Sequence, residues 1–247
     1  MKLPRRQFLH LAAGTAALPA VSRIAWAQTY PTRPVRLIEG FGAGGAGDIV
    51  ARLIGQSLSE LLGQSVVIEN RSGAASNIAA EAVVRASPDG YTLLLITTAN
   101  AINATMFKLN FDFIHDIAPV ASIVRVPYVM EVHPSVPAKT VGEFVAYAKA
   151  NPSKINMASA GIGSGTHVAG EMFKTMADLD LVHVPYRGGG SAITDLLGGQ
   201  VQVFFSGVGT SIEYIGTGKV RALAVTTAVR LEALPGRPNR GRFRPWL

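Results

Sequence analysis

The hydrophobic pattern of residues 35–62 changes from a continuous run to a helical repeat. Residues 35–39 read VRLIE, a short segment rich in branched apolar side chains, which predicts a strand. After the glycine-rich stretch FGAGGAGD, apolar residues recur three and four positions apart as far as Leu62, the period of one helix face. The pattern predicts a strand, a glycine turn and a helix. Such a turn leaves the first helix amides without partners, and glycine lets an anion approach them.

Further strands and helices alternate along the chain. Apolar runs predict strands at residues 65–69 and 91–97, with a helix at 78–86 between them. The second run, YTLLLIT, is continuous, as in strands that are buried on both faces. This alternation predicts a parallel sheet in an α/β fold. Because ligands of such sheets bind beyond the carboxyl ends of the strands, we expect residues 41–48 and 97–100 to lie together.

A second α/β lobe is expected after the apolar run at residues 117–132, which is too long for one strand of a compact sheet. Beyond it, the glycine turns GIGSGT (161–166) and YRGGGS (186–191) repeat the strand–turn–helix pattern. The apolar run 221–227 could return the chain to the first sheet. We expect a ligand cleft between two lobes. The predicted boundaries are 28–128 plus 225–247 for lobe 1 and 129–224 for lobe 2.

Residues 1–27 have the composition of an export leader. Arg5 and Arg6 precede a mostly apolar run, and Ala25-Trp26-Ala27 forms an A-x-A cleavage site. The paired arginines favour a twin-arginine-type signal peptide that is cleaved after Ala27. At roughly 14 residues, the apolar run is shorter than the ~20 residues that a membrane-spanning helix needs. We therefore expect an exported protein.

The net charge of +7 does not indicate nucleic-acid binding, because the basic residues are unevenly distributed. Eight of the 23 lysines and arginines lie in residues 1–27 or in the last 11 residues, which leaves 15 against 16 acidic residues. The rest of the chain has no basic excess, and we exclude a nucleic-acid partner. The absence of cysteine excludes disulfides, thiolate catalysis and cysteine metal ligands.

Motifs for catalysis are absent from the sequence. It has neither a G-x-S-x-G nucleophile motif nor a G-x-x-x-x-G-K-[ST] phosphate loop. No pair of carboxylates suits acid–base catalysis, and no two histidines show metal-ligand spacing. We expect no catalytic residue, no metal and no cofactor. Asp48 is interpreted chiefly as a helix cap. His167 begins the helix after GIGSGT, where it could line the cleft.

A dinucleotide site is the alternative interpretation of the first glycine turn. Gly42, Gly44 and Gly47 fit G-x-G-x-x-G, and Glu69 closes the next strand, where a dinucleotide enzyme holds the ribose. An exported NAD(P)-dependent oxidoreductase is therefore a second hypothesis. Against it, an N-cap carboxylate at Asp48 would occupy the amides that a pyrophosphate needs.

Five segments carry a family resemblance: LIEGFGAGGAGDIVARLIGQSLSELLGQSVVIENRSGA, SPDGYTLLL, VHPSVPAKTVGEF, HVPYRGGGSAITDLLGGQV and KVRALAVTT. In this order they resemble the periplasmic solute-binding proteins of the tripartite tricarboxylate transporter family, also called Bug receptors. The resemblance implies a two-lobed type II periplasmic-binding-protein fold that closes on a small organic carboxylate. It also implies a periplasmic receptor, not an enzyme, that delivers this ligand to integral membrane transporter subunits.

In this family the carboxylate is held largely by backbone amides, hydroxyls and waters, and the matching positions imply a set of ligand-binding residues. Lobe 1 would contribute Phe41, Ala43, Gly44, Gly45, Asp48, Thr97 and Thr98. Lobe 2 would contribute Ser159, Gly161, Gly163, Ser164, His167 and Ser206. Ala46-Gly47 replaces the family's more usual glycine followed by serine or threonine, so we expect one hydroxyl ligand to be missing.

Residues 235–247 read PGRPNRGRFRPWL, with four arginines, three prolines and no acidic residue. This composition cannot bury enough apolar surface to fold. Members of the family continue here for several tens of residues, with helices that pack on lobe 1. We expect a frameshift or truncation near Pro235 that leaves lobe 1 without part of its cover.

Overall fold

The computed structural model describes residues 30–228 together with Leu231 and Leu234. The predicted leader (1–27) and the arginine-rich tail (235–247) lie outside the described residues. Both sheets belong to the unit of the chain that begins at Arg33. Among the described residues, every helix is too short or too polar to span a membrane.

The helices and strands follow one another as two groups. Lobe 1 comprises β1 (Val35–Glu39), α2 (Ala46–Leu62), β2 (Val66–Asn70), the short 3₁₀ helix η1 (Ala74–Ser76), α3 (Asn77–Val84), β3 (Thr92–Leu95) and α4 (Thr98–Met106). Lobe 2 comprises β4 (Tyr128–Val132), α5 (Val141–Ala150), β5 (Asn156–Ser159), α6 (Gly165–Ala177), β6 (Val182–Pro185), α7 (Gly189–Leu197), β7 (Val203–Gly207), α8 (Val208–Gly216) and β8 (Arg221–Val225).

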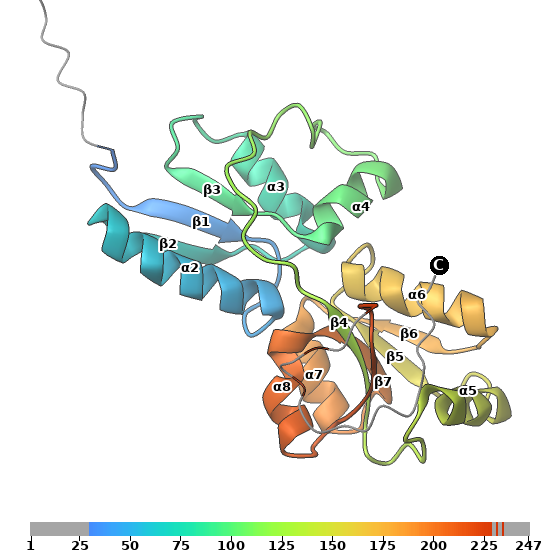
Figure 1. The fold of residues 1–247 in the computed structure, drawn as a ribbon. Coiled ribbons are helices and arrows are strands. Elements are labelled where there is room, and N and C mark those ends of the chain that lie inside the picture. Colours follow the sequence, from blue (N-terminus) through green and yellow to red (C-terminus); the bar gives the residue numbers. More distant parts are fainter. Residues whose placement is uncertain (1–29, 229–230, 232–233, 235–247) are drawn as a thin grey trace, which may run out of the picture. The chain divides into compact units, whose positions relative to one another are not determined.

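Lobe 1 is built on a three-stranded parallel sheet in the order β2-β1-β3. Helix α2 lies on one side of the sheet and α3 on the other (Figure 1). Side chains alternate along β1, so Leu37 packs with Ala51 of α2, whereas Ile38 is buried on the opposite face. Gly63 ends α2 in the left-handed conformation (φ 66°), and its amide donates to Ser59 O. The parallel α/β arrangement predicted for this part of the chain is confirmed.

Two details of lobe 1 differ from the sequence prediction. The run 91–97 forms only the four residues of β3, and of these only Leu95 is buried. The reason is that β3 pairs with β1 alone among the described strands and so lies at the sheet edge. Helix α4 has no counterpart in the prediction. Its signal is a capping box, in which Thr97 Oγ1 accepts from Ala99 N and Asn100 Oδ1 accepts from Thr97 N.

Lobe 2 is built on a five-stranded mixed sheet in the order β6-β5-β7-β4-β8. Strand β5 runs parallel to β6 and β7, whereas β4 runs antiparallel to β7 and β8. Successive side chains point to opposite faces. Phe205 packs with Phe144 of α5 and Phe173 of α6, and its neighbour Phe204 packs with Leu196 of α7 and Ile215 of α8. Two helices therefore cover each face of the sheet (Figure 1).

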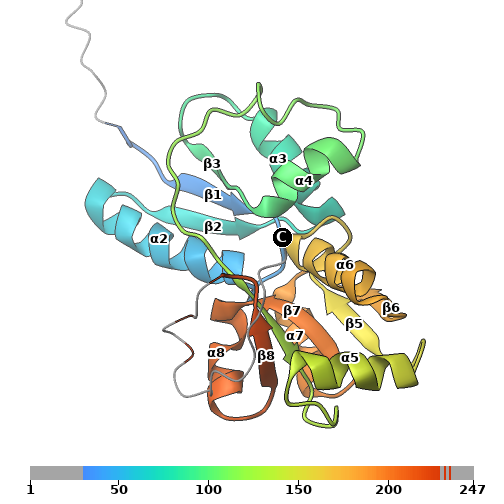
Figure 2. The same ribbon diagram turned by 45° about the vertical axis from the view of Figure 1, so that its right-hand side comes forward.

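The segment 107–127 crosses from lobe 1 to lobe 2 without a helix or strand. Apolar side chains are exposed in it, and Val120 has 83% of its surface accessible. The run 221–227 does not return to the first sheet, because β8 completes the antiparallel pairing of β4 in the second sheet (Figure 2). The predicted lobe boundary between residues 224 and 225 falls at the last residue of β8.

The chain on either side of lobe 2 is tied together where β4 begins. Tyr128 N donates to Thr226 Oγ1 at 3.0 Å, and Thr226 N donates to Tyr128 O at 2.9 Å. The entry to lobe 2 and the end of β8 therefore lie side by side.

Candidate functional site

A cavity of about 220 Å³ lies where loops of the two lobes meet. Its walls come from the β1–α2, β3–α4 and β5–α6 turns, the crossing segment, and the starts of α7 and α8. The polar side chains that line it are Glu39, Thr97, Thr98, Tyr128, Ser164, Thr166 and Thr210, and the larger apolar ones are Phe41, Val50, Leu95, Ile96, Val124, Val126 and Phe204. As predicted from the strand ends, the stretches 41–48 and 97–100 contribute to one common cavity.

Five helices, α2, α4, α6, α7 and α8, start beside this cavity. In the first turns of α2 and α6, no acceptor from the described chain meets the amides of Ala46, Gly47, Gly165 or Thr166. These N–H groups carry the positive end of each helix dipole. The described residues that line the cavity include no lysine or arginine. The cavity therefore offers an anion site that is made of backbone.

Hydroxyl groups extend the polar wall between α4 and α6. The Tyr128 hydroxyl lies 3.0 Å from Thr98 Oγ1 and so joins β4 of lobe 2 to the start of α4 in lobe 1. A Cβ atom on Gly165 would overlap with both hydroxyls, so glycine is needed at this position. Ser164 caps α6, because its hydroxyl accepts from His167 N at 3.2 Å.

Glu39 places a buried carboxyl group on the cavity wall. Its Oε2 accepts from Phe41 N at 2.8 Å and from Asn70 Nδ2 at 3.2 Å. Its Oε1 is buried and has no hydrogen-bond partner among the described residues. Burial raises the pKa of Glu39 to about 7, and the nearby charge of Asp48 adds to the increase. Glu39 is therefore a candidate binding group, although its sequence position did not predict one.

Asp48 does not line the cavity and instead stabilises the first turn. It is the third residue of α2, and Gly45 is the N-cap. Its Oδ2 accepts from Gly44 N at 3.0 Å, and its carboxylate pairs with Arg52 at 3.0 Å. Burial opposes ionisation, but Arg52, the Gly44 amide and Asn70 together hold the pKa of Asp48 below its usual range. Asp48 thus stabilises the start of α2, as expected for a capping residue, but from the first turn and not from the N-cap position. Its role as a ligand residue stays a prediction.

The glycine turns of the two lobes touch through their backbones. Gly42 N donates to Arg187 O at 3.0 Å. A Cβ atom on Gly190 would overlap with Ala43 O, so the contact requires glycine at this position. Ala43 and Gly44 lie at this junction and not on the cavity wall. In the structure they contribute to the contact between the turns, and their role as ligand residues stays a prediction.

Three residues predicted in lobe 2 shape the second glycine turn without lining the cavity. Ser159 Oγ lies 2.7 Å from His183 Nε2 and accepts from Gly161 N at 3.1 Å. Gly161 and Gly163 have φ values of 123° and 86°, in the left-handed region that favours glycine. Ser159, Gly161 and Gly163 therefore position the turn that carries Ser164.

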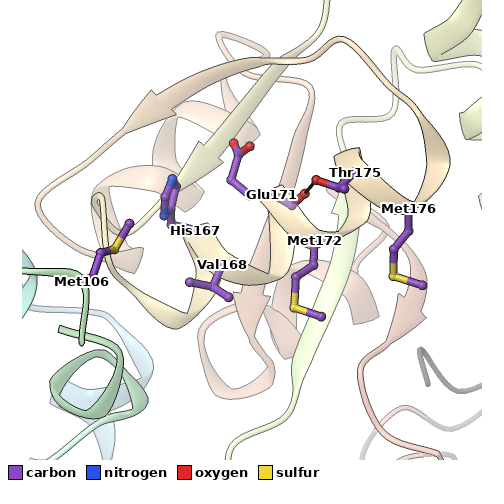
Figure 3. A pocket seen from close by; sticks show the side chains of 7 residues that line it. All are labelled: Met106, His167, Val168, Glu171, Met172, Thr175 and Met176. Atoms are coloured by element: carbon purple, nitrogen blue, oxygen red, sulfur yellow. Dashed lines mark hydrogen bonds between the residues drawn. The ribbon is translucent and has the colours of Figure 1, made fainter. Parts of the chain in front are cut away.

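His167 lines a different hollow of about 540 Å³ along α6. Figure 3 shows His167 and Glu171 on one side of this helix and Val168, Met172 and Met176 on the other. The ring nitrogen Nδ1 of His167 accepts from the backbone of the turn, at 3.3 Å from Gly163 N. His167 is not among the residues that line the smaller cavity, and its role as a ligand residue stays a prediction.

His167 also meets His183, although the two are far apart in the sequence. Their ring centroids are 4.5 Å apart, and one ligand atom from each of His167, Glu171 and His183 lies within 4.8 Å of the others. Burial lowers the pKa of both histidines, which favours the neutral form that binds metals. Histidines that show no metal-ligand spacing in the sequence are therefore brought close together by the fold. Among the described residues, α6 and β6 bring together a group that could hold a transition-metal ion.

Ser206 lies in the core of lobe 2 and not on the cavity. Its hydroxyl is 2.6 Å from Ser211 Oγ, which donates to Glu131 Oε1 at 2.7 Å. All three residues are fully buried. Burial raises the pKa of Glu131 to about 7, although these hydrogen bonds act in the opposite direction. Ser206 therefore belongs to a buried network around this carboxyl group.

Replacing Glu131 with glutamine is expected to stabilise the protein at alkaline pH. The folded state keeps the Glu131 proton up to a pH of about 7, whereas the unfolded chain releases it near 4.5. The stability that goes with this proton is complete below pH 4.5 and is lost as the pH rises through 7. Above about pH 8, Glu131→Gln should raise the free energy of unfolding by up to about 3 kcal/mol, with no difference near pH 4.5.

Thermal unfolding at both pH values measures this effect. Glu60→Gln, at an exposed position of α2, is the matched control and should change stability by less than about 0.5 kcal/mol. Equal stability of Glu131→Gln and wild type in alkaline solution would contradict the burial of an ionisable group.

Five of the thirteen predicted ligand residues line the cavity: Phe41, Gly45, Thr97, Thr98 and Ser164. Other residues line the cavity without having been predicted, and they include Glu39, Tyr128, Gly165, Thr166 and Thr210. Gly165 and Thr166 directly follow the capping serine, which is a usable signal. Glu39 ends an otherwise largely apolar strand, and its charge at that position is the signal that could have found it.

Two α/β lobes with helix starts around a small cavity define a solute-binding protein of the two-lobed periplasmic type, and solved structures agree. BugD, a periplasmic binding protein, is 36% identical, with a TM-score of 0.81 over 85% of this chain and 70% of that chain. An R. palustris protein solved with adipate is 38% identical, with a TM-score of 0.77 over 81% and 68%. MatC from Rhodopseudomonas palustris, with bound malate, is 32% identical, with a TM-score of 0.76 over 81% and 69%.

The family is established by its sequence pattern. The pattern described as tripartite tricarboxylate transporter family receptor matches residues 50–240. This chain belongs to that family, as the five segments predict. The chain spans 69%, 66% and 64% of the length of three curated relatives that it matches, at 36%, 33% and 37% identity. All three are proteins of Bordetella, and one of them is BugT of Bordetella pertussis.

Proposed function

We propose that this protein is an exported receptor that captures a small organic carboxylate and delivers it to the integral membrane subunits of a tripartite tricarboxylate-type transporter. The observation that carries the proposal is the convergence of unpaired helix-start amides on a cavity without lysine or arginine among its described residues. Amides of this kind hold carboxylates through partial charges and directed hydrogen bonds. Solved relatives were obtained with adipate and malate. The predicted leader, cleaved after Ala27, would place the receptor in the periplasm.

The cavity suits a small ligand with an apolar middle. Its volume of about 220 Å³ is below the about 300–1,000 Å³ of pockets for drug-sized molecules. Val124, Val126 and Phe204 supply apolar walls that can pack against a carbon chain. The family to which the chain belongs is one of receptors. We therefore propose that the protein binds its ligand without converting it.

The dinucleotide hypothesis is less well supported by the same geometry. Two amides of the G-x-G-x-x-G turn already have acceptors, because Gly42 N donates to Arg187 O and Gly44 N donates to Asp48 Oδ2. A pyrophosphate would need such amides to be free. The family to which the chain belongs is one of receptors.

Binding of a dicarboxylate should depend only weakly on salt. Amides carry partial charges and act at short range, so added ions screen them less than they screen exposed lysines or arginines. Between about 50 mM and about 500 mM salt, the Kd for adipate or malate should rise by less than about threefold. Calorimetry on protein purified without refolding measures this, with uncharged adipamide as the control that should not bind.

Two outcomes would contradict the proposal. A tenfold or larger loss of affinity across the salt series would indicate binding by basic side chains. Native mass spectrometry that finds a retained dinucleotide would favour the oxidoreductase hypothesis.

A further inference from the structure

Glu39 is an unusual group for the wall of a carboxylate-binding cavity. It is the last residue of β1, its side chain is fully buried, and it is the one carboxylate among the described lining residues. A Cβ atom on Gly47 would lie 2.5 Å from Glu39 Oε1, so the carboxyl group takes the space that any side chain at position 47 would need. The Glu39 carboxyl group thus stands beside the first turn of α2, where unpaired amides also face the cavity.

The two oxygens of the Glu39 carboxyl group differ in their hydrogen bonding. Oε2 is fixed by hydrogen bonds from Phe41 N and Asn70 Nδ2. Oε1 is fully buried, without a donor from the described chain. A buried carboxylate oxygen without a hydrogen bond is costly, and a ligand that supplies a donor would remove that cost.

The charged groups near Glu39 do not neutralise the negative charge of its ionised carboxyl group. Asp48 on α2 contributes a second negative charge nearby. Arg52, four residues after Asp48 in α2, is paired with Asp48. The other ionisable side chain among the described lining residues is Tyr128, whose hydroxyl is hydrogen-bonded to Thr98. A ligand therefore meets negative charge at Glu39 and positive partial charges at the helix starts.

We propose that Glu39 Oε1 accepts a hydrogen bond from an ammonium group of the ligand, so that the receptor prefers an amino carboxylate to a dicarboxylate. The inference rests on the proposed function, because it assumes that the ligand carboxylate lies on the helix-start amides. The ammonium group then completes the hydrogen bonding of Glu39 at the other end of the ligand. A second ligand carboxylate at the same place would instead face a like charge.

Ionisation of Glu39 favours the same ligand class. Its pKa of about 7 means that the charged form is readily reached at neutral pH, and an ammonium group within about 4–6 Å would favour this form further. Affinity for an amino carboxylate should therefore increase as the pH rises from about 6 to about 8. Affinity for a dicarboxylate should decrease over the same range.

The test compares 4-aminobutyrate with succinate, which differ in carrying an ammonium or a second carboxylate. Wild type should bind 4-aminobutyrate at least about tenfold more tightly than succinate at neutral pH. Glu39→Gln keeps the shape and an acceptor for Phe41 N but removes the charge. It should weaken 4-aminobutyrate binding by about tenfold or more, leave succinate binding unchanged or stronger, and abolish the pH dependence. Glu69→Gln, on the neighbouring strand and outside the cavity, should leave both affinities as in wild type.

The outcomes separate this inference from the proposed function. If wild type prefers succinate and Glu39→Gln has wild-type affinities, the ammonium subsite is wrong while carboxylate binding stands. A dicarboxylate found by native mass spectrometry in freshly purified protein would likewise contradict the ammonium subsite and support carboxylate binding. If neither 4-aminobutyrate, succinate, adipate nor malate binds to wild type, the proposed function fails as well. Circular dichroism of each variant establishes that it is folded.

Discussion

Replacing Gly165 with valine is expected to weaken carboxylate binding by at least about 100-fold, or about 3 kcal/mol. A side chain at this position overlaps with the Tyr128 and Thr98 hydroxyls and enters the cavity beside the free amides of α6. The variant therefore displaces the two hydroxyl groups of the cavity wall and also reduces the volume that is left for the ligand. Calorimetry with adipate, malate and 4-aminobutyrate as probes measures the loss.

Gly142→Val is the control for this variant. Gly142 also lies in the first turn of a helix, and a Cβ atom there meets nothing within 4 Å. It should retain wild-type binding. Wild-type affinity of Gly165→Val for all probes that wild type binds would show that the ligand lies elsewhere.

Gly190→Ala is expected to separate binding from the stability of the lobe. Alanine is the better helix former, so α7 should become more stable by up to about 1 kcal/mol. The added methyl group, however, overlaps with Ala43 O of the opposite turn and should prevent the contact between the two glycine turns. Because both turns contribute to the cavity wall, affinity should fall by at least about 100-fold.

Hydrogen exchange provides a second measurement for this variant. In wild type the Gly42 amide donates to Arg187 O and should be protected when ligand is bound. In Gly190→Ala this protection should disappear, whereas Gly142→Ala should keep it. A Gly190→Ala protein that binds its ligand and protects the Gly42 amide would show that the cavity does not require the contact between the turns.

The sequence predicts the parts of the fold that depend on local periodicity. The strand, glycine turn and helix at residues 35–62 and their recurrence at 161–166 follow from spacing and from glycine. The position of β8 cannot be predicted in this way, because the apolar pattern of residues 221–227 does not specify the strand with which they pair. Only the antiparallel edge of β4 determines its place.

The part of the candidate site that is formed by helix starts could be predicted from the sequence. Thr97 and Ser164 are recognisable as caps, and both line the cavity. Glycines that face the cavity cannot be distinguished in sequence from those that contact the other lobe, as Gly45 and Gly44 illustrate. The role of Tyr128 depends on a hydroxyl that reaches across to the other lobe, which no local pattern records.

The main-chain origin of the anion-binding groups has a consequence for how ligand preference can change. A substitution cannot delete a backbone amide unless it introduces proline or distorts the start of the helix. Replacements at Ile96, Val124 or Phe204 alter the width and polarity of the cavity while the amides remain. After gene duplication, a copy could acquire a different acid through such changes without passing through an intermediate that binds no anion. Binding of the carboxylate group would then be retained, whereas the side chains that line the cavity would change and determine which acid is preferred.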